Sequence, residues 1–389
     1  MVKVNYSDRL NSLPPYLFVE IDRKKKDLMA KGVDIINLGV GDPDNPTPQH
    51  IIKAGKKALD DPKNHVYPFG IGLKRFREAV AAWYSERFGV KLDIDTEITS
   101  LIGSKEGIGH IHLGFVNQGD VVLVPEPGYP VYNGATVLAG GVSHFMPLLE
   151  ENDFLPDIES IPKEVLKKAK LMFLNYPNNP TSATANRGFF ESVIKLAKEY
   201  NIIVCHDAAY SEMYYSKEKP MSFLELDGAK EVGIEFHSLS KTYNMTGWRI
   251  GWACGNKDVI KGLVKVKANI DSGAFQMVQE AAVAALTGPQ NCTDKMRALY
   301  KERRDILLDG FSKLGWKTKT PEASFYVWIK VPKGYNSIDT ASIIMDKAGV
   351  VVTPGVGFGK SGEGYIRMAL TVDKKRIEEA LGRIGKIKW

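Results

Sequence analysis

The chain has 389 residues, of which 44% are hydrophobic and 25% charged, a composition typical of a globular protein. The formal net charge of +6 is spread along the chain, which favours small anionic substrates over nucleic acid. No apolar run has the length of a membrane span, and early charges are unlike a signal-peptide core, so we expect a cytoplasmic protein that contacts neither nucleic acid nor membranes.

Strand-like and helical segments alternate through the middle of the chain. Apolar residues at helical spacing predict a helix from Leu73 to Tyr84 that stops at Gly89, and a second helix from Phe190 to Ala197. The predicted strands are Ile98–Ile102, Val121–Val124, Leu171–Leu174, Ile202–His206 and Glu231–Phe236. This alternation predicts an α/β fold with a parallel sheet covered on both faces.

The pattern changes near Gly288. A long charged helix is predicted over Thr293–Leu314, followed by strands at Phe325–Val331, Gly349–Thr353 and Tyr365–Leu370 and a closing helix from Lys374. We expect residues 48–288 to form a large domain and 289–389 a small α+β domain. Residues 1–47, which contain little strand signal, are expected to form an N-terminal arm and part of the small domain.

The cysteines and histidines show no metal-site spacing, so no bound metal is expected. Cys205, Cys254 and Cys292 lie far apart without a CxxC pair, which predicts free thiols. Cys205 is interpreted as a small core residue rather than a nucleophile.

A polar or Gly/Pro-rich cluster follows each predicted strand of the large sheet. These clusters are Gly103–Gly107, Pro125–Pro130, Asn175–Thr181, Asp207–Tyr210 and His237–Thr242. Open parallel sheets bind ligands at the carboxyl ends of their strands. We therefore predict that all of these clusters converge on one pocket.

Lys241 lies in the last of these clusters. An isolated lysine is usually a surface residue, but Ser238, Ser240 and Arg249 flank this one and could hold a phosphate by charge-assisted hydrogen bonds. Ser104 opens a predicted helix, whose N-terminal amides offer a second set of phosphate donors. A lysine beside a phosphate site suits an aldehyde cofactor that is bound as an imine.

Asp207 ends a predicted buried strand. Such an aspartate is usually a cap or turn residue. The functional alternative is a carboxylate that faces the ring nitrogen of pyridoxal 5′-phosphate and keeps that nitrogen protonated. A buried carboxylate needs a cationic partner, and a protonated pyridine would be one.

Several motifs occur together in the order and spacing of a known family. They are Asn175-x-x-x-Asn179-Pro180-Thr181, Asp207-x-x-Tyr210, Ser238-x-Ser240-Lys241-x(7)-Arg249 and Tyr365-Ile366-Arg367-Met368-Ala369-Leu370. With them the chain resembles the fold-type I, class I and II aminotransferases over essentially its whole length. The resemblance implies pyridoxal phosphate as cofactor, and a mainly parallel sheet between helices plus a smaller α+β domain.

The resemblance also implies a role for each motif residue. Lys241 forms the Schiff base and moves the proton between the substrate α-carbon and the cofactor. Asp207 pairs with the ring nitrogen, Tyr210 and Asn179 hydrogen-bond the ring oxygen, and Tyr129 stacks on the ring. Tyr129 could equally be a plain core residue.

The remaining implied contacts concern the phosphate and the substrate. The residues around the phosphate are Ser104, Lys105, Ser238, Ser240 and Arg249. Arg367 binds the substrate α-carboxylate as a bidentate fork, and Gly41 lets the backbone approach that carboxylate. Tyr67 reaches the phosphate of the other subunit, which implies a homodimer. Arg367 could instead be a strand-surface arginine and Tyr67 a turn residue.

A further set of segments resembles the LL-diaminopimelate aminotransferases, which use glutamate as amino donor on a route to lysine. The segments are Pro14–Ile21, Gly39–Asp44, Gly103–Gly107, His206–Glu212 and Glu235–Arg249. Lys105, Asn179 and Tyr16 are candidate substrate contacts, Lys105 and Tyr16 for the distal carboxylate. The loop Pro68–Gly72 contains no acidic residue for the distal ammonium, and Ser182 stands where many relatives carry glycine.

Three alternatives stay open at this point. The substrate could be alanine, aspartate, glutamate or an aromatic amino acid. The same cofactor could serve β-elimination or decarboxylation. A non-enzymatic alternative is the aminotransferase-like effector domain of a transcription regulator, although the Leu38–Gly41 segment comes too early to leave room for a preceding winged helix.

Overall fold

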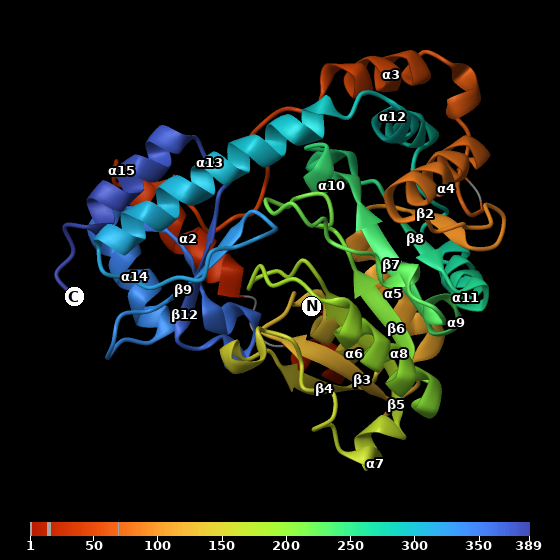
Figure 1. Cartoon of the computed structure of the whole chain (residues 1–389), viewed down its shortest axis with the longest axis horizontal. Coiled ribbons are helices and arrows are strands. Elements are labelled where there is room, and N and C mark those ends of the chain that lie inside the picture. Colours follow the sequence, from red (N-terminus) through yellow and green to blue (C-terminus); the bar gives the residue numbers. More distant parts are fainter. Residues whose placement is uncertain (1, 14–16, 69) are drawn as a thin grey trace.

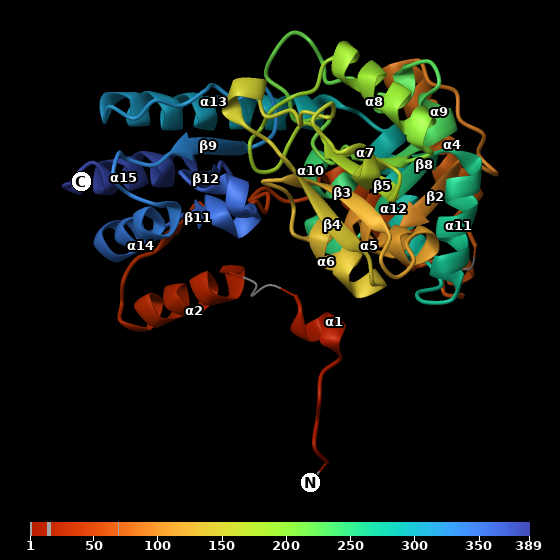
Figure 2. The ribbon, with the colours of Figure 1, turned by 90° about the horizontal axis from the view of Figure 1, so that it is seen from below.

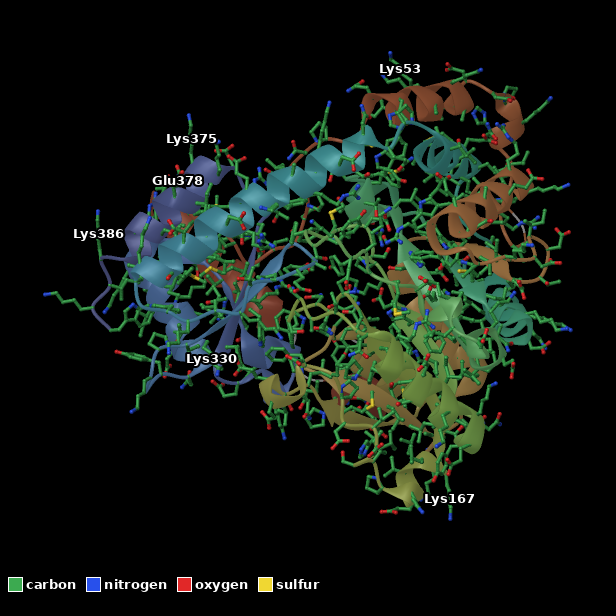
Figure 3. The ribbon with its side chains drawn as sticks, in the orientation of Figure 1. Lys53, Lys167, Lys330, Lys375, Glu378 and Lys386 are labelled. Atoms are coloured by element: carbon green, nitrogen blue, oxygen red, sulfur yellow. The ribbon has the colours of Figure 1, made fainter. Side chains whose placement is uncertain are left out.

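The computed structural model describes residues 2–13, 17–68 and 70–389 (Figure 1). None of the helices in these ranges is both long and apolar enough to cross a membrane. Charged side chains lie on the periphery, where Lys53, Lys167 and Lys386 point outward (Figure 3).

A large sheet carries the strand order β2-β8-β7-β6-β5-β3-β4. The strands are β2 (Ile98–Leu101), β3 (Val121–Glu126), β4 (Val142–Pro147), β5 (Ala169–Asn175), β6 (Ile203–Asp207), β7 (Gly233–Ser238) and β8 (Gly251–Gly255). All strands predicted for this sheet are confirmed. The sheet is parallel except for β8, which runs antiparallel to both of its neighbours, β2 and β7.

Two strands of this sheet were not predicted. The β8 segment contains two glycines and no β-branched residue, so it lacks a strand signal. The β4 strand lies at the sheet edge and is largely exposed. Because β8 reverses direction between β2 and β7, β2 runs parallel to the rest of the sheet and ends at the same edge.

Helices cover both faces of the large sheet (Figure 1). One core contains Phe173 and lies under α5 (Ser104–Phe115), α6 (Val131–Ala139) and α11 (Lys257–Ala268). The opposite core contains Leu174, the next residue of β5, because side chains alternate across a strand. The helices on that side are α3 (Gln49–Leu59), α4 (Lys74–Phe88), α8 (Arg187–Tyr200) and α12 (Gln276–Thr287).

The predicted elements after residue 290 surround a third core. The long helix is α13 (Asn291–Lys313), and the closing helix is α15 (Lys374–Ile384). Strands β9 (Tyr326–Lys330), β11 (Thr353–Pro354) and β12 (Tyr365–Ala369) pair antiparallel, and α14 (Ser337–Ala348) packs beside them. Ile36 and Leu38 join this core, and β1 (Ile36–Asn37) pairs with β10 (Val350–Val351).

The N-terminal segment touches both parts of the molecule. Helix α1 (Asp8–Asn11) lies at α6, where Arg9 donates to the carbonyl oxygen of Leu138, and α2 (Leu17–Ala30) lies below the small sheet (Figure 2). Asp44 accepts two hydrogen bonds from Arg303 of α13, at 2.7 and 2.8 Å. The division at residues 47 and 288 stays a prediction.

Candidate active site

A cavity of about 320 Å³ opens where the strands of the large sheet end. Every predicted polar cluster contributes to its wall, so their convergence is confirmed. The residues that line it are Gly39, Val40, Gly41, Ser104, Lys105, Tyr129, Asn175, Asn179, Asp207, Ala209, Tyr210, Ser238, Ser240, Lys241, Thr246, Arg249, Tyr326, Phe358 and Arg367.

Lys241 lies in α10 (Leu239–Thr242), a short helix that begins directly after β7. Ser238 caps this helix by accepting a hydrogen bond from the amide of Ser240, so β7 and its cap orient the lysine. Its Nζ donates to the carbonyl oxygen of Gly41 at 2.9 Å. The lysine amine therefore faces the segment around Gly41, which precedes the large sheet in the chain.

The guanidinium of Arg249 closes one end of the cavity against the start of α5. A Cβ built on Gly103 would lie 2.3 Å from Arg249 Nη2, so a larger residue there would displace the guanidinium. Arg249 itself has a φ of 55°, an unusual left-handed backbone for a residue with a side chain. Ser104 opens α5 here as predicted, so an arginine and a helix N-terminus meet in a cradle suited to an anion.

Asp207 is a buried carboxylate in the wall of the cavity. Its Oδ2 accepts a 2.8 Å hydrogen bond from the hydroxyl of Tyr132, and the amide of Ala209 donates to Oδ1 at 3.3 Å. Burial raises its pKa above the ordinary value, because desolvation outweighs these hydrogen bonds. The protein alone thus leaves this charge poorly compensated, as expected of a residue that meets a cation in the cavity.

Arg367 reaches the cavity from β12 and is 4% exposed, so it is not a surface arginine. It donates to Asn179 Oδ1 at 2.8 Å and to the carbonyl oxygen of Gly39 at 2.6 Å. Its guanidinium lies between the rings of Tyr326 and Phe358, with its carbon 4.1 and 4.6 Å from the two centroids. This packing holds the planar fork that bidentate carboxylate recognition needs.

Tyr326 is a cavity residue that sequence analysis missed. Its hydroxyl lies 3.2 Å from the Tyr210 hydroxyl, and a Cβ on Gly41 would lie 1.9 Å from it. Position 41 therefore needs a glycine because the Tyr326 ring, in addition to any ligand, lies against its backbone. In the sequence Tyr326 is one of several apolar residues in a strand, and nothing distinguishes it from core.

Tyr132 was missed for a different reason. It lies near the start of α6, three residues after Tyr129, which precedes the helix, and the two rings lie 6.0 Å apart. That spacing was the available signal, but core packing explains it equally well. The ring of Tyr132 does pack in the core, 5.0 Å from that of Phe173, and only its hydroxyl serves Asp207.

The structure places the other predicted contact residues differently with respect to the cavity. Lys105 Nζ lies 5.8 Å from the centroid of Tyr129, and both residues line the cavity. Tyr67 is 73% exposed and is not part of this cavity wall. Tyr16 lies outside the described residues. The binding roles of all these residues stay predictions.

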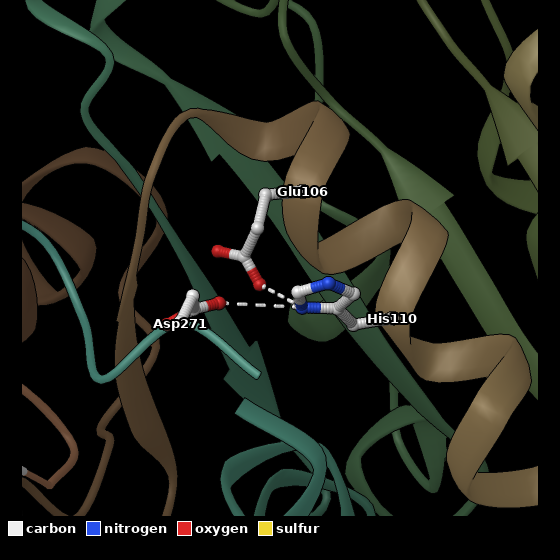
Figure 4. Close-up of side chains that lie close together, drawn as sticks. All are labelled: Glu106, His110 and Asp271. Carbon is white, nitrogen blue, oxygen red and sulfur yellow. Dashed lines mark ion pairs between the residues drawn. The ribbon is translucent and has the colours of Figure 1, made fainter. Parts of the chain in front are cut away.

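Glu106 and His110 of α5 form a cluster with Asp271, which comes from the loop after α11 (Figure 4). These side chains could in principle ligate a metal. The ammonium of Lys267 lies 2.7 Å from Glu106 and 3.2 Å from Asp271, so a lysine already supplies positive charge to both carboxylates. The cluster links α5 to the loop at residues 271–273, where Asp271 also accepts from the amide of Gly273.

Comparison with known proteins identifies the family. The model of "Aminotransferase class I and II" matches residues 33–384. The chain belongs to this family. Among its relatives, the LL-diaminopimelate aminotransferase of Syntrophobacter fumaroxidans is 59% identical over 98% of this chain and 99% of its own. That of Aquifex aeolicus is 55% identical over the same shares of the two chains.

Solved structures agree with the family. The substrate-bound structure of BacF from Bacillus subtilis has a TM-score of 0.95 and 40% identity, with 99% of this chain and 98% of that chain covered. An aspartate aminotransferase variant from Thermus thermophilus has a TM-score of 0.93 and 29% identity, with 99% and 100% covered. The predicted fold class is confirmed: an aminotransferase fold with a large, mainly parallel sheet.

Proposed function

We propose that this protein is a pyridoxal-phosphate-dependent aminotransferase that transfers an amino group between LL-diaminopimelate and 2-oxoglutarate in lysine biosynthesis. One observation carries the general reaction: Lys241, Asp207 and Arg367 share the wall of one cavity. The substrate choice rests on full-length relatives, 52 to 59% identical to this chain, that are named LL-diaminopimelate aminotransferases.

The residues of the cavity fit pyridoxal phosphate. The cradle of Arg249, Ser104 and the α5 N-terminus suits a phosphate dianion. Asp207, whose pKa burial raises, suits a cationic ring nitrogen. Lys241 supplies the amine that would hold the aldehyde. When bound, the cofactor supplies a ring that accepts electrons from the substrate α-carbon.

The protein's own groups then supply binding and proton transfer. Arg367 orients the substrate by its α-carboxylate, with its guanidinium fixed between two aromatic rings. The amine of Lys241 would be the base that takes the proton from the substrate α-carbon and the acid that delivers it to the cofactor. Its hydrogen bond to Gly41 gives this amine a fixed resting position beside the substrate carboxylate site.

We further propose a homodimer in which Tyr67 contacts the cofactor phosphate of the partner subunit, and a cytoplasmic location. Tyr67 is 73% exposed, and its neighbour Val66 is 58% exposed. Burial of both side chains against a second copy would remove this apolar area from water.

The substrate assignment is tested with a panel of donors. Purified protein with pyridoxal phosphate is expected to form glutamate from LL-diaminopimelate and 2-oxoglutarate, one mole for each mole of oxo acid. Alanine, aspartate and phenylalanine are the comparison donors. Rapid turnover of alanine or aspartate without turnover of LL-diaminopimelate would reject LL-diaminopimelate as the substrate. The assignment as an aminotransferase would still hold. Loss of amino groups as free ammonia would instead indicate elimination.

Substitution of Arg367 tests carboxylate binding. Arg367→Lys is expected to lower kcat/KM for the amino acid about 10- to 100-fold, because an ammonium cannot reproduce two parallel hydrogen bonds. Steady-state kinetics at several donor concentrations measures this. Cofactor affinity is followed by fluorescence in parallel, because Arg367 also donates to Asn179. An unaltered KM and kcat would assign the carboxylate to another residue.

A further inference from the structure

A buried carboxylate and two histidines lie behind Asp207, on the opposite face of the large sheet. His206, Glu235 and His237 are at most 3% exposed, and the proposed mechanism uses none of them. Side chains alternate along β6, so Asp207 faces the cavity and Tyr132, whereas His206 faces the core that contains Phe190 and Phe223. The cluster therefore lies on the side of the large sheet opposite the cavity, and its member His206 directly precedes Asp207 in the chain.

Glu235 is built to be an anion. Its oxygens accept hydrogen bonds from the Tyr84 hydroxyl at 2.8 Å, the Ser222 hydroxyl at 2.5 Å and the Phe223 amide at 2.7 Å. Burial alone would raise its pKa, but hydrogen bonds from His206 and His237 outweigh burial and hold the pKa below the ordinary value. Three further donors on one carboxyl group favour the ionised form for the same reason.

His206 lies between two groups that can only accept. Its Nδ1 is 2.6 Å from Glu235 Oε1, and its Nε2 is 3.1 Å from the carbonyl oxygen of Tyr176. A carboxylate and a backbone carbonyl offer no proton, so each ring nitrogen must carry its own. Turning the ring over would place carbon atoms against both oxygens and lose both hydrogen bonds.

We propose that His206 is a positioning residue, protonated on both ring nitrogens, that ties β7 to the segment carrying Asn179. The proposal rests on the proposed function, because it concerns the groups that would hold the cofactor. Tyr176 follows Asn175, which donates to the carbonyl oxygen of Asp207 at 2.7 Å and accepts from the amide of Asn179 at 2.8 Å. By holding the carbonyl group of Tyr176, His206 thus fixes the segment that positions Asp207 and Asn179.

The proton on His206 also acts through its charge. Burial raises the pKa of Asp207, and the positive charge of His206 opposes that rise. Glu235 and Asp207 are the titratable groups that interact with His206 itself. The titratable groups that act on Glu235 in turn are Tyr84, His237 and Cys254. Among the described residues in hydrogen-bond contact with the ring, Glu235 brings the only negative charge. The Glu235 carboxylate is therefore the counter-charge that a doubly protonated His206 ring contacts.

The protonation state is tested directly by NMR of protein labelled with ¹⁵N-histidine and freed of cofactor. At pH 8, His206 is expected to show two protonated ring nitrogens, with its signals assigned by their loss in His206→Gln. His112 is a matched control in the same spectrum. It is equally buried, and burial lowers its pKa to about 4, so it should carry a single ring proton. A single proton on His206 at pH 8 would overturn the proposal.

The positioning role is tested with the same variant. His206→Gln is expected to bind pyridoxal phosphate about tenfold more weakly, the loss typical of one charge-assisted hydrogen bond, and to have a lower kcat with the donor KM unchanged. His112→Gln, which lies outside the cavity wall, should change neither. If His206→Gln keeps the wild-type cofactor affinity and the wild-type kcat, the positioning role of His206 is rejected.

Two outcomes are kept apart by the design. If the wild-type protein binds no pyridoxal phosphate, the proposed function is rejected. The NMR measurement uses cofactor-free protein and therefore still tests the protonation of His206. If His206→Gln does not fold, neutron diffraction of the wild-type protein locates the hydrogens. Density at both Nδ1 and Nε2 of His206 supports the proposal, and density at one alone rejects it.

Discussion

Lys241→Ala is expected to lower the turnover number by at least about 1000-fold, or ~4 kcal/mol in activation free energy. The variant loses both the amine that would hold the cofactor and the base that would move the α-proton. The Lys241 amine is part-buried and contacts Gly41. Borohydride reduction followed by peptide mass spectrometry should attach the cofactor to Lys241 in the wild-type protein and leave the variant unmodified.

Lys53→Ala is the matched control for this experiment. Lys53 is exposed on α3 and points away from the molecule (Figure 3), so its loss should leave turnover and labelling unchanged. Far-ultraviolet circular dichroism establishes that both variants are folded. Sustained turnover by Lys241→Ala would overturn the assignment of the reactive lysine.

Asp207→Asn is expected to separate stability from activity. In the cofactor-free protein the substitution removes a buried charge, and the Tyr132 hydroxyl can accept from the new amide. We expect the free energy of unfolding to rise by about 1 kcal/mol. Activity should fall about 10²- to 10³-fold, because the neutral amide no longer holds a proton on the cofactor ring. Thermal unfolding and steady-state kinetics measure the two effects.

The pH dependence follows from the same carboxyl group. The pKa of Asp207 is raised above 3.8 in the folded protein, so between 3.8 and the raised value the native state holds a proton that the unfolded chain has lost. The Asp207 contribution to stability therefore falls as pH rises through this window. The cofactor-free wild type should show this loss, and Asp207→Asn should not. An identical pH dependence in both proteins would show that Asp207 is not the group responsible.

Much of the fold could be predicted because local patterns and tertiary structure agree. The strand at β6 is rich in β-branched residues and is buried on both faces, and Gly89 ends α4 in the left-handed conformation. The strand β8 could not be predicted, because its own residues have little strand propensity. It is extended because it pairs with β2 and β7. Pairing across the sheet supplies hydrogen bonds that a single segment does not reveal.

The candidate site divides in the same way. Lys241, Asp207 and Arg367 carry chemistry that their motifs reveal, and the structure brings them to one cavity. Tyr132 and Tyr326 act through one hydroxyl each while their rings pack as core, so their spacing in the sequence reports only packing. No motif in the sequence gives His206 a role, since the proposed function depends on acceptors that come from β7 and from the segment after β5.

The reversed strand β8 has a consequence for protein engineering. Ser238 and Gly251 pair directly across β7 and β8, so the loop between them is closed at its base and carries both Lys241 and Arg249. An insertion there would shift the two charged groups relative to each other, because neither base position can slide without breaking the sheet register. Redesign for a differently sized cofactor therefore has to preserve the length of this loop.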